Sequence, residues 1–384
     1  MSDHKKNRIL VYNDSFFPTS QTFIYYQVQS LSEKYDVELL GKQFLNPHGY
    51  EIDSYKTYEI GLPKNIFERA VSKIYREIFK SPLYLNPRSY VQLREIFKKN
   101  RYSAIHAHFG YNALNILRHA KKYRIPLVVT FHGYDASMML SDENYKNRLP
   151  ELFDYASAII LVSRHMIETL NLERWLDKVK IIPCTVDPDE FEVRDKTSSN
   201  KIKILHSGRL TDKKGVPDLI RVFKNLRQKY DTIELHIVGD GKKLEECKEL
   251  VQKYNLEKSV FFYGAVTHDE VKKFMSTADI FVLNSRVGDN GDMEGTPVTL
   301  MEAMCSKVPV ISTRHAGIPD VIEDGVDGLL VDERDNEGLE DALSTFIENP
   351  DMRQTCSENA RNTVLQEYTV DRMKGKLQQV FQNI

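Results

Sequence analysis

Short apolar runs rich in β-branched residues alternate along the chain with segments of helical periodicity. We predict strands in the first half at 8–13, 36–40, 103–107, 126–131, 157–162 and 179–182, and in the second half at 202–206, 233–238, 259–263, 279–283, 308–312 and 328–331. Their apolar positions are consecutive, which is typical of strands that a parallel sheet buries on both faces. Helical segments of about 10–15 residues between them complete β-α-β units. The pattern therefore predicts an α/β protein with two parallel sheets.

The stretch 187–200 interrupts this series. It is charged and Ser-rich and has no hydrophobic periodicity, as expected of a linker. We therefore predict an N-terminal domain over 1–190 and a C-terminal domain over 191–365, which suits a chain of 384 residues.

Charge and composition exclude several classes of protein. The chain has 53 Lys and Arg against 55 Asp and Glu, so its net charge of −2 excludes a broadly basic nucleic-acid coat and an acidic disordered tail, and we expect no nucleic-acid partner. No apolar run approaches the roughly 18 residues that span a bilayer. The four cysteines lie far apart without a C-x-x-C pair, which argues against structural zinc and a disulfide scaffold. We therefore expect the protein to reside in the reducing cytoplasm.

Two helical segments, 66–79 and 88–100, are both amphipathic and basic. Over 64–101 the sequence has ten basic and three acidic residues. One interpretation is a pair of helices whose apolar sides pack on the core and whose charged sides face solvent. The other is attachment to an anionic membrane surface, where each basic residue contributes about 1 kcal/mol. The second interpretation predicts a cytoplasmic protein that is peripheral at the inner face of the cell membrane.

The segment 284–304 carries the densest chemical signal. A Gly- and Asp-rich loop follows a predicted strand and leads into a helix that Pro297 suits in its first turn. The free amide groups and dipole of that helix end favour an anion, and Gly295 allows a ligand close to the backbone. Glu294 and Glu302 would flank a phosphate there and accept hydrogen bonds from sugar hydroxyls. The alternatives are a helix cap for Glu294 and a surface carboxylate for Glu302.

A second signal lies at 204–216, where a predicted strand runs into Arg209 and Lys214. Both cations leave the carboxyl end of the strand, which is the edge where α/β sheets bind ligands. Without a metal ion, the protein has to supply cations that stabilise a departing pyrophosphate. Ordinary loop charges are the alternative.

In the first half, His132 also follows a predicted strand, and it could approach a reacting sugar or be a structural histidine. His106 and His108 alternate along a strand and face the same way, but zinc needs at least one more ligand, which nothing nearby supplies. We therefore expect no metal site. A G-x-G-x-x-G fingerprint fails after Gly239 because Leu244 takes its last place, which weakens a dehydrogenase interpretation.

These segments together resemble the GT-B glycosyltransferases of the large retaining family called group 1, or family four, and bacterial polysaccharide-biosynthesis members in particular. Glu294 and Glu302 are similar to its E-x7-E motif, and HSGRLTDKKG resembles its phosphate segment. IPDVIEDGVDGLLV, IIPCTVDPDEF, TFHGYD and SQTFIYYQVQSL resemble further segments in the same order. Cys184-Thr185 stands where members of this family commonly have Asn-Gly.

The resemblance implies two Rossmann-like domains that face a central cleft, with a C-terminal helix near 366–384 packing back on the first domain. The second domain would bind a nucleotide-sugar donor: Arg209 and Lys214 at the diphosphate, Glu294 at the donor sugar and Glu302 at the ribose. Backbone amides would come from Gly295, Thr296 and Val298, with Pro297 lying between them on the donor, and Val266 would contact the base. His132 would lie near the donor sugar. No metal or cofactor is implied, because the leaving diphosphate is thought to help deprotonate the acceptor.

The resemblance thus predicts a retaining, metal-independent hexosyltransferase that acts on a lipid-linked or cell-surface polysaccharide acceptor. A UDP-sugar is the first choice of donor because that nucleotide is commonest in the family, and a GDP-sugar stays open. Two other functions fit the architecture: a sugar-nucleotide epimerase, which needs no acceptor, and a non-catalytic protein that binds nucleotide sugars.

Overall fold

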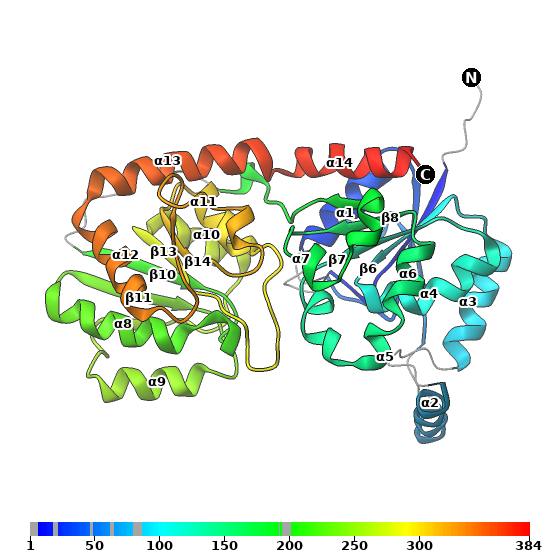
Figure 1. Ribbon diagram of the computed structural model, residues 1–384, viewed down its shortest axis with the longest axis horizontal. Coiled ribbons are helices and arrows are strands. Elements are labelled where there is room, and N and C mark those ends of the chain that lie inside the picture. The colour runs from blue at the N-terminus through cyan, green and yellow to red at the C-terminus, as the bar shows by residue number, and fades with distance from the viewer. Residues whose placement is uncertain are drawn as a thin grey trace. The chain divides into compact units, whose positions relative to one another are not determined.

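The computed structural model describes residues 7–17, 22–46, 49–61, 65–79, 87–191, 193 and 201–384. The chain forms two compact units (Figure 1). Unit 1 comprises Met1–Pro183 and Met373–Ile384, and unit 2 comprises Cys184–Arg372. The division therefore falls at Pro183 rather than at residue 190, and most of the predicted linker lies outside the described residues.

Unit 1 is built on a seven-stranded parallel sheet in the order β5-β3-β1-β6-β7-β8-β9. Its strands are β1 (Arg8–Tyr12), β3 (Asp36–Gly41), β5 (Lys56–Glu59), β6 (Ala104–His108), β7 (Leu127–Phe131), β8 (Ala158–Leu161) and β9 (Val179–Ile181). The short strands β2 (Ser15–Phe16) and β4 (Gln43–Phe44) pair separately. Its helices are α1 (Thr22–Ser32), α2 (Ile66–Phe79), α3 (Pro87–Lys99), α4 (Gly110–Tyr123), α5 (Glu143–Lys146), α6 (Leu149–Tyr155) and α7 (Met166–Thr169).

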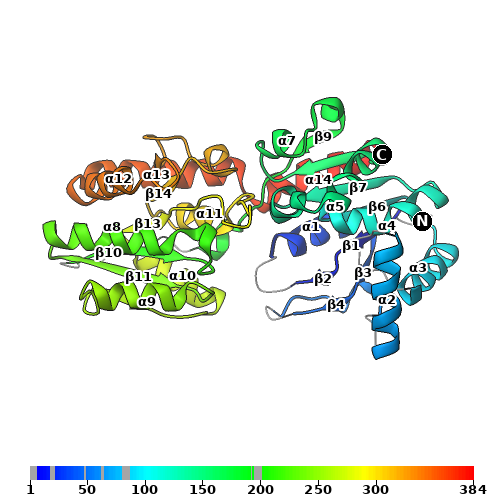
Figure 2. The ribbon, with the colours of Figure 1, turned by 60° about the horizontal axis from the view of Figure 1, so that its bottom comes forward.

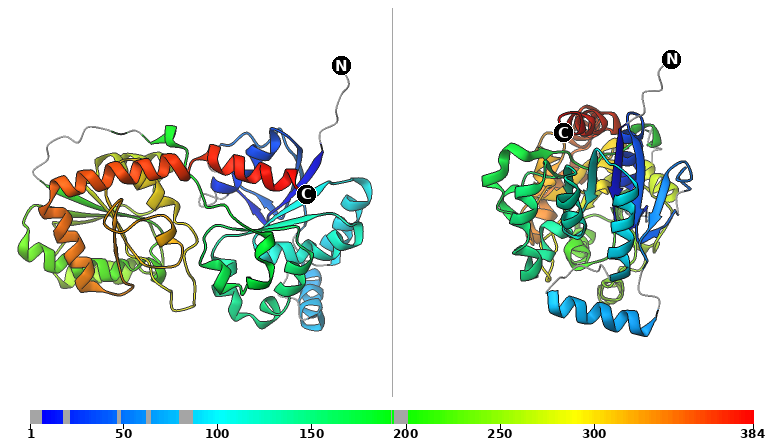
Figure 3. Two further views of the ribbon diagram at one scale, coloured as in Figure 1. Left: turned by 45° about the horizontal axis from the view of Figure 1, so that its top comes forward. Right: turned by 90° about the vertical axis from the view of Figure 1, so that its right-hand side faces the viewer.

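The chain runs in opposite directions from the centre of this sheet. From β1 it crosses through α1 to β3, whereas from β6 it crosses through α4 to β7. Because such crossovers are right-handed, α1 and α4 cover opposite faces. The last helix, α14 (Val370–Gln382), lies beside α1 (Figure 3). Gln378 Nε2 donates to the carbonyl of Ser30 at 2.9 Å, and Lys374 pairs with Glu33 at 2.6 Å.

Unit 2 has a six-stranded parallel sheet in the order β12-β11-β10-β13-β14-β15. Its strands are β10 (Ile202–Ser207), β11 (Ile233–Val238), β12 (Val260–Phe262), β13 (Ile280–Leu283), β14 (Val310–Thr313) and β15 (Leu329–Val331). Its helices are α8 (Val216–Lys229), α9 (Leu244–Lys253), α10 (His268–Thr277), α11 (Val298–Cys305), α12 (Asn336–Glu348) and α13 (Pro350–Glu367). This is the doubly wound order, in which the direction of winding reverses between the first and fourth strands.

Alternate strand residues of unit 2 point into two separate layers. One face forms a buried cluster with α8, α9 and α12, in which Ile204, Leu235 and Val282 of the strands meet Phe223 and Phe346 of the helices. Figure 2 shows α8 and α9 lying side by side. The opposite face is left for α10, α11 and α13. Burial on both faces explains why the strands have consecutive apolar residues.

The twelve predicted strands are all present, each within two residues of its expected ends. The prediction of two Rossmann-like domains is therefore confirmed. Among the described residues, no helix has the length and apolar content that a membrane crossing requires.

Candidate active site

The topology of unit 2 marks where a ligand can bind. In a doubly wound sheet, ligands bind outside the carboxyl ends of the strands where the winding reverses, here between β10 and β13. The segment after β10 leads to Lys214 and Gly215, and the loop after β13 begins at Asn284. The two ends touch: Asn284 Nδ2 donates to the carbonyl of Gly215 at 2.8 Å. A Cβ on Gly215 would lie 2.4 Å from the Asn284 carbonyl, and its φ is +63°, so only glycine permits this approach.

Glu294 and Lys214 bind each other at this point. Lys214 Nζ lies 2.8 Å from Glu294 Oε1, and Ser285 Oγ donates to the same oxygen at 3.1 Å. Burial alone would raise the pKa of Glu294, which is 7% exposed, but the charges of Lys214 and Lys213 lower it to about 2. Glu294 is therefore a permanent anion at neutral pH. The family resemblance predicts that both residues bind the donor, but the sequence did not predict the ion pair between them.

The loop between β13 and α11, residues 284–297, is tied to the phosphate segment by further ion pairs. Lys213 Nζ lies 2.9 Å from Asp292 and donates to the carbonyl of Met293 at 3.3 Å. Arg286 pairs with Asp212 at 2.8 Å and also with Asp218. These contacts connect two segments that are distant in the sequence. They hold Lys214 and Glu294 in one place.

Arg209 differs from Lys214 in its surroundings. It is exposed just beyond β10, and its guanidinium has no carboxylate partner within the described part of the chain. It is therefore available to an anionic ligand without first breaking an ion pair.

The amino end of α11 adds amide donors to the same edge. Gly295, Thr296 and Pro297 are buried and lead into the helix at Val298, so Pro297 precedes the first turn rather than lying within it. The first amide groups of a helix lack partners inside it and attract anions. The hydroxyl of Thr299 is also buried, and it neither accepts nor donates a hydrogen bond among the described residues. Sequence reasoning missed Thr299, although its place in the first turn could have identified it.

Glu302 is buried one turn further along α11, so it is not a surface carboxylate. Its Oε1 lies 3.1 Å from His268 Nε2. This hydrogen bond, with the charge of Glu302, raises the pKa of His268 against the effect of burial. His268 Nδ1 is also 3.6 Å from Glu190, a residue of the segment that precedes β10. Val266 is half-buried in the loop just before α10, two residues from His268, which the sequence did not single out.

His132 lies in unit 1, after β7, in a cluster of rings. Its Nε2 is 3.1 Å from His108 Nδ1, and its ring centroid is 4.8 Å from that of Phe23 and 4.6 Å from that of Phe109. Its backbone amide donates to Asp135 at 2.9 Å. Burial lowers the pKa of His132 to about 3, so the ring is neutral at pH 7. A neutral ring suits hydrogen bonding to a sugar but supplies no positive charge; its role at the donor stays a prediction.

Metal-binding side chains do not gather in threes in the described ranges. His106 Nε2 instead bonds Thr130 Oγ1 at 2.8 Å. That donor binding needs no metal stays a prediction.

The chain is similar to known glycosyltransferases over most of its length. The sequence profile described as "Glycosyl transferases group 1" matches residues 188–363, and that described as "Glycosyltransferase Family 4" matches residues 20–190. The chain is 30% identical over 292 residues to WcaL of Salmonella typhimurium, a glycosyltransferase assigned to colanic acid biosynthesis, covering 72% of this chain and 70% of WcaL. The chain belongs to the group 1 glycosyltransferases.

A second relative and two solved structures support the family and its fold. The amylovoran biosynthesis glycosyltransferase AmsK of Erwinia amylovora is 34% identical over 238 residues, which cover 60% of this chain; the match spans 58% of AmsK's length. The crystal structure of Anabaena Alr3699/HepE in complex with UDP and glucose superposes with a TM-score of 0.78 at 17% identity, covering 98% of this chain and 100% of that one. Sucrose-phosphate synthase from Thermosynechococcus elongatus gives 0.77 at 17%, covering 98% and 99%. This group 1 glycosyltransferase therefore has the GT-B fold.

Proposed function

We propose that this chain transfers a sugar from a nucleotide-sugar donor, a UDP-sugar, to a lipid-linked or cell-surface oligosaccharide, with retention of the anomeric configuration and without a metal ion. The observation that carries the proposal is the arrangement at the reversal point of unit 2. Exposed Arg209, the Lys214–Glu294 pair and the amino end of α11 meet at one sheet edge.

This arrangement suits the departure of a nucleoside diphosphate. Arg209, Lys214 and the amide groups of Gly295, Thr296 and Val298 would neutralise the charge that develops on the phosphates, which is the main requirement of such a reaction without metal. Glu294, an anion at neutral pH, would accept hydrogen bonds from donor-sugar hydroxyls. Glu302 would do the same for the ribose.

The relatives support the choice of substrates. AmsK is named for amylovoran biosynthesis and WcaL for colanic acid biosynthesis, so a polysaccharide precursor is the acceptor class that they suggest. The Anabaena structure holds UDP and glucose, which favours a uridine nucleotide.

A thermal-shift panel of UDP, GDP, ADP and their sugars tests the donor. A ligand at 100 times its Kd stabilises the fold by about 2.7 kcal/mol, and we expect only the uridine series to do so. Turnover with the best donor and an extract of lipid-linked oligosaccharides, followed by NMR of the product, tests retention. An inverted product, or a nucleotide sugar isomerised without acceptor, contradicts the proposal.

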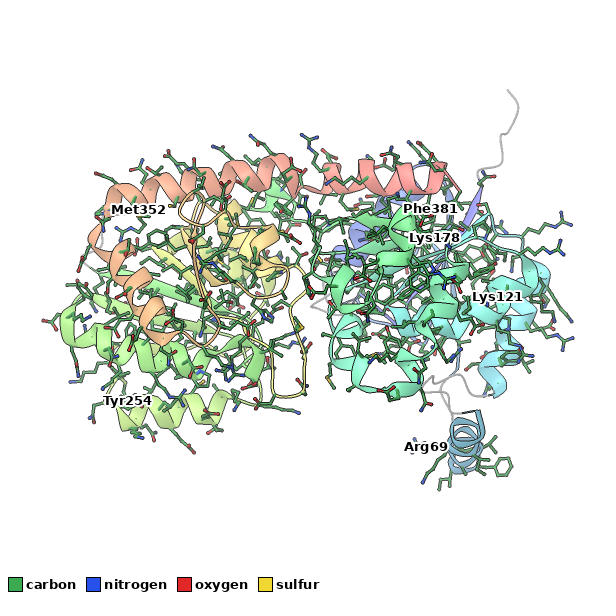
Figure 4. The ribbon with its side chains drawn as sticks, viewed as in Figure 1. Arg69, Lys121, Lys178, Tyr254, Met352 and Phe381 are labelled. Carbon is green, nitrogen blue, oxygen red and sulfur yellow. The ribbon has the colours of Figure 1, made fainter. Side chains whose placement is uncertain are left out.

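The proposal includes attachment to an anionic membrane surface, restricted to α2. Ile66, Phe67 and Ile74 of α2 are 85%, 76% and 57% exposed, and the basic residues Arg69 and Lys73 beside them are exposed too. Figure 4 shows Arg69 among the side chains of this helix. Apolar and basic side chains exposed together on one helix are typical of binding to a lipid interface.

The helix predicted at 88–100 does not support this attachment. Leu93 and Phe97 of α3 are buried, and the Phe97 ring stacks on those of His119 and Tyr123 at 5.6 and 5.7 Å. Its apolar face thus belongs to the core of unit 1, and the core-facing interpretation is the correct one for α3.

Sedimentation with vesicles tests the membrane proposal. We expect vesicles containing anionic phosphatidylglycerol to retain the protein at low salt, and phosphatidylcholine vesicles not to. Arg69→Glu with Lys73→Glu should abolish retention, whereas the same reversal at exposed Lys253 and Lys258 of unit 2 should not. Equal retention of both variants contradicts the proposal.

A further inference from the structure

A buried histidine and a glutamate hold both flanks of the loop that carries Glu294. The backbone amide of Glu294 donates to His315 Nε2 at 3.1 Å, and His315 Nδ1 lies 2.6 Å from Glu333 Oε1. The other oxygen of Glu333 accepts the amide of Val287 at 2.9 Å. His315 follows β14 and is fully buried, and Glu333 follows β15. One side-chain pair thus reaches Val287 near the start of the loop and Glu294 near its end.

These contacts determine where the imidazole carries its proton. A backbone amide can only donate, so His315 Nε2 has to accept and therefore carries no hydrogen. The proton of the neutral ring is then on Nδ1, where it is donated to the Glu333 carboxylate. Because a ring nitrogen's state follows from the hydrogen bond that the other nitrogen makes, Glu333 selects the form of His315 that can bind Glu294.

We infer that His315 and Glu333 are positioning residues that set the place of Glu294 in the donor site. The inference rests on the proposed function for its consequence in catalysis, but not for the geometry. This His315–Glu333 pair, the clamp, holds the backbone amide of Glu294. Lys214 and Ser285 bind the carboxylate of the same residue. With both held, the carboxylate keeps its position when Lys214 turns to a phosphate.

The placement matters because side chains hold the peptide that joins Met293 to Glu294, with His315 at the amide of Glu294 and Lys213 at the carbonyl of Met293. The residues after it, Gly295 and Thr296, precede the helix, so no helical hydrogen bond holds this part of the loop. Buried side chains that hold a reacting group within a fraction of an ångström are a general requirement of transferase sites. Losing the clamp should therefore lower the rate of sugar transfer more than it lowers nucleotide affinity.

Amide-resolved hydrogen exchange tests the clamp without any substrate. His315→Phe keeps a planar aromatic ring but removes the acceptor, so the amide of Glu294 should exchange at least tenfold faster. His315→Gln offers a side-chain oxygen and should keep exchange within threefold of the wild type. Glu333→Ala should speed exchange at both Val287 and Glu294, although His315 is intact. The matched control is His236→Phe, in β11 of the same unit, which should leave the loop unchanged.

Two further measurements decide between a clamp and a merely structural histidine. Nitrogen-15 NMR of labelled histidine should show His315 protonated at Nδ1 in the wild type and redistributed in Glu333→Ala. With UDP as the probe, titration calorimetry should give a Kd within threefold of the wild type for His315→Phe, whereas kcat with the donor found by the panel should fall at least tenfold.

A proton on Nε2 in the wild type, or a Glu294 amide that exchanges within twofold of the wild type in His315→Phe, overturns the inference. If the wild type turns over no nucleotide sugar, the proposed function fails. Exchange and NMR then still decide whether the clamp exists.

Discussion

Replacing Lys214 with methionine removes one charge from the centre of the candidate site and keeps most of the side-chain stem. Glu294 is left buried beside Lys213, which already pairs with Asp292 at 2.9 Å. The lowering of the Glu294 pKa from its ordinary 4.5 to about 2 corresponds to about 3 kcal/mol of folded-state stabilisation. Because removing one partner of a buried pair also leaves a buried charge, we expect Lys214→Met to cost about 3–5 kcal/mol at pH 7.

The sign of the pH dependence follows from the direction of the shift. A carboxyl whose pKa is lowered in the folded state contributes stability above its ordinary value of 4.5, and the contribution is lost as pH falls toward about 2. Without Lys214, the largest charge that opposes burial and a hydrogen bond to Glu294 are lost, so the pKa of Glu294 rises from its wild-type value although Lys213 still lowers it. The variant can then relieve its penalty by protonation, so the difference from the wild type should be smaller at pH 5 than at pH 7.

A double-mutant cycle with Glu294→Gln isolates the interaction. The double variant should be at least about 2 kcal/mol more stable than the sum of the single losses predicts. Urea unfolding followed by circular dichroism reports both units, whereas the fluorescence of Trp175, the chain's single tryptophan, reports unit 1 alone. The fluorescence transition should not move. Lys242→Met, at an exposed lysine of unit 2, is the control.

A coupling energy below about 0.5 kcal/mol would refute this reasoning, because it would mean that water or another group already compensates Glu294. So would a loss that appears equally in the Trp175 transition, since the damage would then not be confined to unit 2.

Three further outcomes follow from the same site. Arg209→Ala should weaken UDP binding by about 10- to 100-fold in calorimetry, as expected for a charged hydrogen bond, and leave uridine within twofold; equal losses for both ligands would count against a phosphate contact. Glu302→Gln should weaken UDP and uridine alike, because both carry the ribose, and an effect on UDP alone would contradict that role. Since Glu302 raises the pKa of His268, that pair stabilises fully below pH 6.5 and less as pH rises, so the Tm of the wild type should fall more steeply from pH 6 to 9 than that of His268→Ala, and parallel curves would be inconsistent with it.

Local sequence patterns predicted much of this protein. Consecutive apolar residues identify twelve strands because a strand covered on both faces has no polar side. The three strands that were missed have no such pattern: β5, with the sequence KTYE, lies at the edge of its sheet and is largely exposed, and β2 and β4 have two residues each. The two glutamates, two cations and the glycine before the helix are visible for a similar reason, since their types and spacing report chemistry directly.

Tertiary structure decided which of these residues meet. The order of the strands places β10 beside β13, and this pairing brings Lys214 to Glu294 across a long stretch of sequence that no local pattern spans. The same applies to His268 on Glu302 and to the Glu333–His315–Glu294 chain, whose members follow three different strands or helices. The two basic helices, which look similar in sequence, also differ in burial: the apolar side of α3 packs into unit 1, whereas apolar residues of α2 are exposed. Hydrophobic periodicity tells which face of a helix is apolar, but only the packed fold determines what covers that face.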